Sequence, residues 1–291
     1  MIKGKNSKKS ISLALLILIQ LVISSAAPLL SNYLDSYIKV GMVKVVYAIS
    51  FVCPYVLWLK LIKPVGMSYK KHTWCEYKLP AFFIAFAAIV AFLQVNIVLL
   101  EILGVTSVSS SSGVFEGFWG FLFSVLMYVL IPAITEEMFS RGVVMRVAGG
   151  GIRAAILSGV IFGLCHFNPF QLVYAIGSGI VLSLLVLYTD DLKLAGLLHI
   201  CVNATVLVLS YLSRICSVGL YVAIECIVWL AVLALGIYFC YVLLRDHHTQ
   251  IYEKNKDIEQ KKEDITYSEI FSGSMMVVYA VILLVTVFRF I

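Results

Sequence analysis

Charged residues are scarce in this chain of 291 residues, and long runs without any charge separate the few that occur. Aspartate, glutamate, lysine and arginine make up 13% of the sequence, against about 25% in an ordinary soluble domain. The mean hydropathy is +1.00. These values exclude a soluble globular domain, and we expect the chain to lie in a membrane.

Several familiar patterns are also missing. The seven cysteines include no C-x-x-C pair, so they indicate neither a disulfide framework nor a thiolate metal site. No basic face is interleaved with aromatic residues, and the net charge of +6 is therefore no evidence for binding to nucleic acid. The sequence contains neither H-E-x-x-H, the helical zinc signature, nor the G-x-G-D of aspartyl intramembrane proteases.

Apolar stretches near the length that crosses a bilayer, roughly 20 residues, recur along the whole sequence. We expect an all-α fold, a polytopic transmembrane helical bundle of about eight or nine spans. The nine candidate spans are residues 11–30, 42–59, 80–100, 118–135, 152–167, 170–188, 193–212, 219–244 and 274–291. They leave no room for a soluble core, so residues 1–291 are predicted to form a single membrane domain.

The basic residues predict the orientation, because lysine and arginine near span ends stay on the cytoplasmic side. With the N-terminus in the cytoplasm, all but four of the 22 basic residues fall in cytoplasmic segments. The exceptions are Lys39, Lys44, Arg214 and Arg289. This distribution favours an odd number of spans, and it places the charged segment 245–272 in a cytoplasmic loop. Residues 1–27 also fit a signal peptide, although we favour a retained first span.

Three short patterns of polar residues interrupt the apolar runs between residues 136 and 203, where such side chains are costly and usually functional. The patterns are Glu136-Glu137-x-x-x-Arg141, Phe162-x-x-x-His166 and His199-x-x-x-Asn203. Residues four apart share one face of a helix, so Glu137 can pair with Arg141. Glu136 points about 100° away and is left free to react.

Chain breaks at Gly149–Gly151 and at Asp190-Asp191 are predicted on the same cytoplasmic side. Measured from these breaks at 1.5 Å per residue, Glu136, His166 and Asn203 lie about 18, 21 and 18 Å along their helices. We therefore expect the polar groups of the three patterns to reach a similar depth. A cavity open to cytoplasmic water could form there.

The residue types predict hydrolysis at this depth. A carboxylate such as Glu136 can take a proton from water as a general base, and His166 can share or position that water. His199 and Asn203 can donate hydrogen bonds to the oxyanion that forms when water attacks an amide carbonyl. This is an acyl-transfer site without a covalent nucleophile.

In these three motifs the sequence resembles the CPBP family, which comprises CAAX proteases and bacteriocin-processing enzymes and is also called the Abi family. The resemblance covers roughly residues 118–212, the expected catalytic core, and the motifs occur in order in successive spans. It implies that Glu136 activates water with His166 as partner, and that His199 and Asn203 stabilise the oxyanion. Glu137, Arg141 and Phe162 would be structural or orienting residues.

The resemblance also implies partners, cofactor and location. The family is described as metallopeptidase-like, and Glu136, His166 and His199 can supply nitrogen and oxygen ligands for zinc. A metal-free glutamate mechanism fits the same residues. The expected partners are membrane lipid and a membrane-anchored peptide or protein: a CaaX-type tail, a bacteriocin leader or another anchored segment. We expect a multi-pass protein of a bacterial plasma membrane.

Two alternatives stay open at this point. A non-catalytic role, in bacteriocin immunity or in binding at the membrane, is compatible with the resemblance. A rhomboid-like serine protease would use Ser178, in Gly177-Ser178-Gly179, with His199. The serine dyad would leave Glu136 and His166 unexplained.

Overall fold

All regular elements that the computed structural model describes are helices, which confirms the predicted all-α fold. The described residues are 2–30, 36–62, 75–105, 117–259 and 265–290. The α-helices are α1 (Ile2–Leu30), α2 (Ser36–Leu57), α3 (Cys75–Ile102), α4 (Gly117–Ser124), α5 (Ile131–Phe139), α6 (Met145–Val147), α7 (Ile152–Leu164), α8 (Leu172–Thr189), α9 (Leu192–Ile215), α10 (Val218–Glu259), α11 (Tyr267–Ile270) and α12 (Gly273–Phe290). Three π-helical segments, η2 (Trp58–Ile62), η3 (Val125–Leu130) and η4 (Ser140–Val144), and the 3-10 turn η5 (Pro169–Gln171) complete the list.

Six helical stretches of the described chain are long and apolar enough to cross a membrane. They are Ile38–Lys60, Tyr77–Ile102, Gly117–Val147, Pro169–Thr189, Leu192–Ile215 and Val218–Arg245. Three further apolar helical stretches are shorter: Ser10–Ser24, Ile152–Leu164 and Gly273–Thr286. Each of the nine expected spans thus coincides with an apolar helix, and the polytopic bundle is confirmed.

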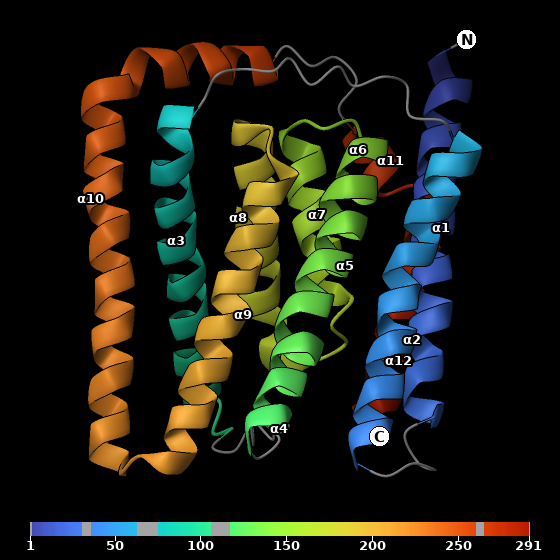
Figure 1. Ribbon diagram of the computed structural model, residues 1–291. Coiled ribbons are helices and arrows are strands. Elements are labelled where there is room, and N and C mark those ends of the chain that lie inside the picture. Colours follow the sequence, from blue (N-terminus) through green and yellow to red (C-terminus); the bar gives the residue numbers. More distant parts are fainter. Residues whose placement is uncertain (1, 31–35, 63–74, 106–116, 260–264, 291) are drawn as a thin grey trace.

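The helices form a bundle in which the central segment of the chain lies between two outer groups of helices (Figure 1). Helices α3 and α10 pack together at one edge, and α1, α2 and α12 stand at the other. The continuous run from α4 to α6 lies between them with α7, α8 and α9. Large apolar side chains such as Ile227, Leu230 and Ile237 on α10 are exposed, as a surface in contact with lipid requires.

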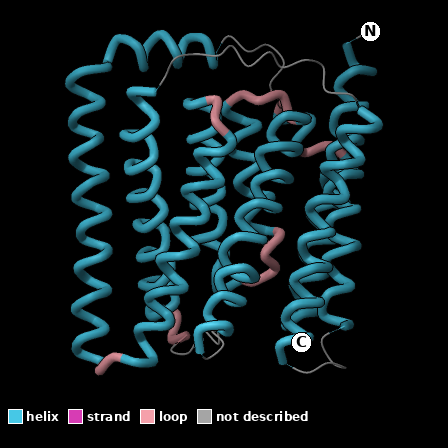
Figure 2. Tube along the Cα trace, in the orientation of Figure 1, coloured by secondary structure: helices cyan, strands magenta, loops and turns pink. Residues whose placement is uncertain are grey.

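Helix α7 ends at Leu164, three residues before the expected end of that span, and the chain turns back partway along the bundle (Figure 2). Phe167 adopts a left-handed conformation with φ of 49°, and Pro169 opens η5, so the helix cannot continue. Asn96 on α3 donates from its side chain to the carbonyl oxygen of Phe170 at 2.9 Å. Irregular backbone at this depth is tolerated because protein surrounds it.

Helices α7 and α8 pack with unusually close backbones. A Cβ atom at Gly159 would collide with the backbone of Ile180, and one at Gly163 with the backbone of Ile176. These glycines are four residues apart and share one helix face, so they form the contact strip on which α8 lies.

The charged segment predicted as the loop 245–272 is helical in its first part, because α10 continues to Glu259. This end of α10 turns across the end of the bundle in Figure 1. Residues 260–264 of the predicted loop lie outside the described chain. The last part contains α11, whose N-cap Thr266 and Glu269 form a capping box.

Candidate active site

The two glutamates lie on α5, between the π-helical segments η3 and η4. Both side chains and that of Arg141 are buried, with at most 3% of each residue exposed. Pro132 at the start of α5 has no backbone N–H, which suits the junction with η3. Single turns of π-helix inside longer helices often mark functional sites.

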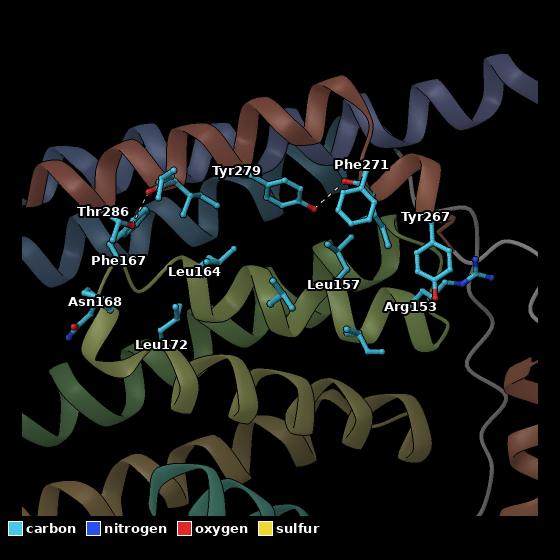
Figure 3. A pocket seen from close by; sticks show the side chains of 16 residues that line it. Arg153, Leu157, Leu164, Phe167, Asn168, Leu172, Tyr267, Phe271, Tyr279 and Thr286 are labelled. Atoms are coloured by element: carbon cyan, nitrogen blue, oxygen red, sulfur yellow. Dashed lines mark hydrogen bonds between the residues drawn. The ribbon is translucent and has the colours of Figure 1, made fainter. Parts of the chain in front are cut away.

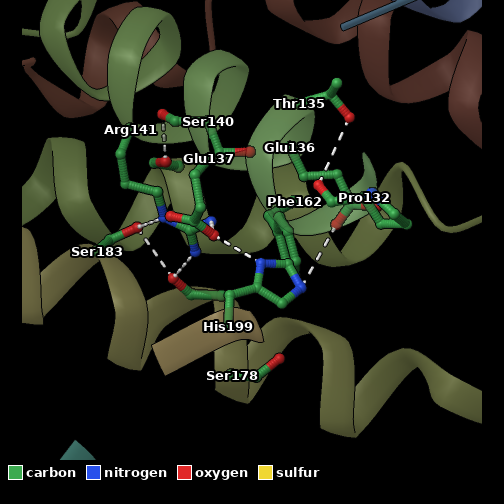
Figure 4. A network of polar contacts seen from close by, with 12 residues as sticks. Pro132, Thr135, Glu136, Glu137, Ser140, Arg141, Phe162, Ser178, Ser183 and His199 are labelled. Atoms are coloured by element: carbon green, nitrogen blue, oxygen red, sulfur yellow. Dashed lines mark hydrogen bonds and ion pairs between the residues drawn. The ribbon is translucent and has the colours of Figure 1, made fainter. Parts of the chain in front are cut away.

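Arg141 is fixed by three hydrogen bonds inside the bundle (Figure 4). Its Nη1 donates to Glu137 Oε1 at 2.7 Å, which confirms the predicted pair. Its Nη2 donates to the carbonyl oxygen of Gly179 at 2.6 Å, and its Nε to Ser183 Oγ at 3.2 Å. The guanidinium carbon lies 4.6 Å from the centre of the Phe162 ring. Arg141 therefore joins η4, α5, α7 and α8.

His199 connects the two glutamates (Figure 4). Its Nδ1 is 2.9 Å from Glu137 Oε1, the oxygen that also accepts from Arg141. A carboxylate oxygen can only accept, so Nδ1 carries the proton. The other ring nitrogen, Nε2, lies 3.9 Å from Glu136 Oε2. Glu137 thus orients the imidazole so that Nε2 faces Glu136.

The placement of His199 starts at the turn before α9. Asp190 adopts a left-handed conformation that ends α8, and Asp191 caps α9 by accepting from the backbone N–H groups of Lys193 and Leu194. Lys78 on α3 forms an ion pair with Asp191 at 2.6 Å. The predicted break at Asp190-Asp191 is confirmed.

Tyr47 is a site residue that the sequence analysis missed. Its hydroxyl on α2 donates to Glu136 Oε1 at 3.1 Å. Glu136 therefore has one oxygen held by a phenol and the other turned toward His199. No motif surrounds Tyr47, and the nearest signal is Lys44 three residues earlier, a cation inside an apolar run.

His166 follows the end of α7 and does not lie on the helix. Its Nδ1 is 2.8 Å from the carbonyl oxygen of Phe162, and the two rings lie 4.9 Å apart. This bond accounts for the spacing of Phe162 and His166, since it caps a carbonyl at the helix end. Within the described residues no hydrogen bond or ion pair joins His166 to Glu136, so their predicted partnership is not a direct contact.

A small cavity of about 40 Å³ brings His166, His199 and Asn203 together. Its other lining residues include Phe162, Tyr174 and Ser178. Asn203 makes no side-chain hydrogen bond with any residue that the structure describes. A cavity of this size admits water but is too small for a peptide.

The serine dyad that we considered as an alternative is not formed. Ser178 donates to the carbonyl oxygen of Ala175 at 3.2 Å. Among the described side chains no hydrogen bond joins Ser178 to His199, although both line the small cavity. A serine nucleophile needs that bond to its base.

A larger cavity of about 550 Å³ lies between α7, the start of α8, α11 and α12 (Figure 3). Two of its polar side chains make hydrogen bonds within the protein: Tyr279 donates to the carbonyl oxygen of Ile270, and Thr286 donates to that of Ile282. None of the predicted site residues lines it. No aspartate, glutamate or histidine of the described chain lines this apolar groove, so we assign it no role in hydrolysis.

The proposed zinc ligands do not assemble as a set. No cluster of three histidine, cysteine, aspartate or glutamate side chains with the geometry of a metal site occurs in the described part of the chain. Glu136 and His199 approach one another, but His166 is held at Phe162. These residues do not fit a zinc site as they stand, and no step below is routed through a metal.

The comparison with known proteins bears on this central region. The family model of the type II CAAX prenyl endopeptidase Rce1-like proteins matches residues 118–205. The matched segment contains all three motifs, and the match confirms the predicted resemblance to the CPBP membrane proteases. No curated protein and no solved structure matches the chain. The matched segment is thus similar to intramembrane endopeptidases, and the apolar helices indicate an integral membrane protein.

Proposed function

Since residues 118–205 are similar to type II CAAX prenyl endopeptidases, we propose that this protein hydrolyses peptide bonds of membrane-associated substrates with a water activated by Glu136. One observation carries the proposal. Glu137 Oε1 takes both ionic partners, Arg141 and His199, so Glu136 keeps an oxygen that faces His199 Nε2 and no guanidinium. The first glutamate can therefore accept a proton, while the second holds the site together.

The reaction follows from these positions. A water between Glu136 Oε2 and His199 Nε2 gives its proton to the carboxylate while its oxygen attacks the carbonyl carbon of the substrate. The oxyanion accepts a hydrogen bond from the side-chain amide of Asn203. His199 can also donate to it only with a proton on Nε2, because its Nδ1–H is bound to Glu137. Glu136 then passes the proton to the amine nitrogen as the C–N bond breaks. His166 lines the small cavity beside His199 and Asn203, and we assign it to orienting the water.

The substrate class follows from the surroundings of the site. Glu136 and His199 are buried among membrane-spanning helices, so the cleaved bond must belong to a segment that enters the membrane. Prenylated CaaX-type tails, bacteriocin leader peptides and anchored regulators all meet this requirement. The protein is proposed to act in a bacterial plasma membrane with its N-terminus in the cytoplasm, as its basic residues predict.

The test is cleavage of a panel of membrane-anchored peptides by purified protein, compared among wild type, Glu136→Gln and His166→Ala. Glu136→Gln is expected to lower kcat by at least about a hundredfold, because loss of a general base costs about 10² to 10⁴. Glu225→Gln is the matched control, since Glu225 is a carboxylate inside α10 that bonds to Trp229 away from the site. Bound metal is quantified in each sample.

Two results would contradict the proposal. Cleavage by Glu136→Gln at the wild-type rate would remove Glu136 from the mechanism. A folded wild-type protein that cleaves nothing on a broad panel would favour the binding or immunity role. Stoichiometric metal, lost together with activity in His166→Ala, would require a metal mechanism.

A further inference from the structure

Lys44 is a cation inside a membrane-spanning helix that the reaction above does not use. It lies on α2, within the apolar stretch Ile38–Lys60, and its side chain is half-buried. A charged side chain at this depth is costly and usually serves binding or transport.

The ammonium of Lys44 is held by aromatic rings. Its Nζ lies 4.7 Å from the centre of the Tyr128 ring and 5.6 Å from that of Tyr47. It makes no hydrogen bond and no ion pair with any residue that the structure describes. Ring contacts stabilise a cation, but they leave its three N–H donors without an acceptor among the described residues.

Lys44 also adjoins the proposed catalytic base. Tyr47, whose ring contacts Lys44, donates its hydroxyl to Glu136. Tyr128 lies eight residues before Glu136 on the same continuous helical run. A ligand bound at Lys44 would therefore lie beside the scissile bond.

We propose that Lys44, flanked by Tyr47 and Tyr128, is a subsite for a carboxylate of the substrate. A carboxylate supplies the missing acceptor for an ammonium in a place of low dielectric, where a charge-assisted bond is strong. It also compensates the buried positive charge. The subsite selects peptides that carry a negative charge a few residues from the cleaved bond. This inference rests on the proposed function and names the substrate chemistry of the same site.

Two pairs of anchored peptides from the cleavage panel test the subsite and distinguish the source of the carboxylate. One pair ends in a free C-terminal carboxylate or in a C-terminal amide. The other has an amidated end and an internal glutamate or glutamine at successive positions after the cleaved bond. Binding and kcat/KM are measured for wild type, Lys44→Met and Lys44→Arg. Lys39→Met on the same helix is the matched control, because Lys39 contacts neither Tyr128 nor Glu136.

Wild type is expected to prefer the acid of one pair by about tenfold, which corresponds to about 1.4 kcal/mol. Lys44→Met abolishes this preference, whereas Lys44→Arg and Lys39→Met retain it. The pair that shows the preference identifies the carboxylate as terminal or internal. Equal binding of acid and neutral peptides by wild type, or a preference that persists in Lys44→Met, overturns the proposal. A preference in binding without any cleavage upholds the subsite and rejects the proposed function.

Discussion

At the scale of single residues, the two adjacent carboxylates of the site have different partners and different proposed roles. Glu137 accepts hydrogen bonds from Arg141 and His199, which fix its position. Glu136 accepts from the neutral phenol of Tyr47 and keeps an oxygen toward His199. Glu137 is therefore held by its hydrogen bonds, whereas Glu136 keeps an oxygen available to a water.

Tyr47→Phe tests the role of that phenol. The variant loses the hydrogen bond to Glu136 Oε1, and a hydrogen bond to a charged group is worth about 1.5–3 kcal/mol. We expect kcat to fall by about tenfold or more with KM nearly unchanged, since Tyr47 positions the base. Steady-state kinetics on a cleaved peptide gives both constants.

Tyr55→Phe is the matched control, because Tyr55 lies two turns further along α2 and packs against Trp58. Its kinetics should equal those of wild type. An unchanged kcat in a folded Tyr47→Phe would show that Glu136 needs no phenol to hold it.

The sequence predicts those parts of the site that depend on one helix or one motif. The spacing of Glu137 and Arg141 predicts their ion pair, because helix geometry alone brings them together. The bond from His199 to Glu137 joins residues 62 apart in the chain, and no local rule gives it. Tyr47 lies outside every motif, so only tertiary packing identifies it.

At the scale of helices and turns, the start of α9 holds His199 at its depth. Asp191 caps the helix and pairs with Lys78 of α3. Burial raises the pKa of the Asp191 carboxyl, but the hydrogen bond and ion pair with Lys78 and the N–H groups of Leu194 and Lys193 outweigh it and lower that pKa overall.

Because the folded pKa of Asp191 is lowered, its stabilisation is present above the ordinary carboxyl pKa of about 3.9 and is lost as the pH falls below that value. We expect the unfolding temperature of wild type to fall as the pH drops below about 4. Asp191→Asn keeps the cap but not the charge. It should be less stable at neutral pH by about 1 kcal/mol and less dependent on pH.

Thermal unfolding in detergent at several pH values measures this difference. Glu101→Gln, which removes an exposed carboxylate at the end of α3, is the control and should follow wild type. Identical pH curves for wild type and Asp191→Asn would exclude the linkage.

The contact between α7 and α8 predicts a second effect at this scale. Gly159→Ala places a methyl group against the backbone of Ile180, which cannot give way without moving α8. We expect a loss of about 1–3 kcal/mol, the usual cost of overpacking, and a lower unfolding temperature. Gly196→Ala is the control, because nothing lies within 4 Å of that position and alanine favours the helix. Equal unfolding temperatures would contradict the close contact.

The helices themselves were predictable because nearly every one is a continuous apolar run. The exception is instructive: residues 152–167 read as one span, yet α7 stops at Leu164. The left-handed Phe167 and the bond from His166 to the Phe162 carbonyl end it, and neither follows from hydropathy. The charged segment after Arg245 reads as a loop, but α10 extends through its first part to Glu259.

At the scale of the whole molecule, the distribution of basic residues predicts which ends of the helices meet the cytoplasm. Lys193 and Ser217 are exposed residues at the two ends of α9. In a variant without native cysteines, Ser217→Cys should react with a membrane-impermeant maleimide on intact cells. Lys193→Cys should react only after permeabilisation, since basic residues stay inside. The reverse pattern would invert the proposed orientation.

The cavity of about 40 Å³ beside His199 and Asn203 is large enough for water but not for a peptide. If the proposed reaction takes place beside this cavity, neighbouring helices must part before a peptide can enter. The thickness and fluidity of the surrounding bilayer would then affect the rate together with the chemistry of the site.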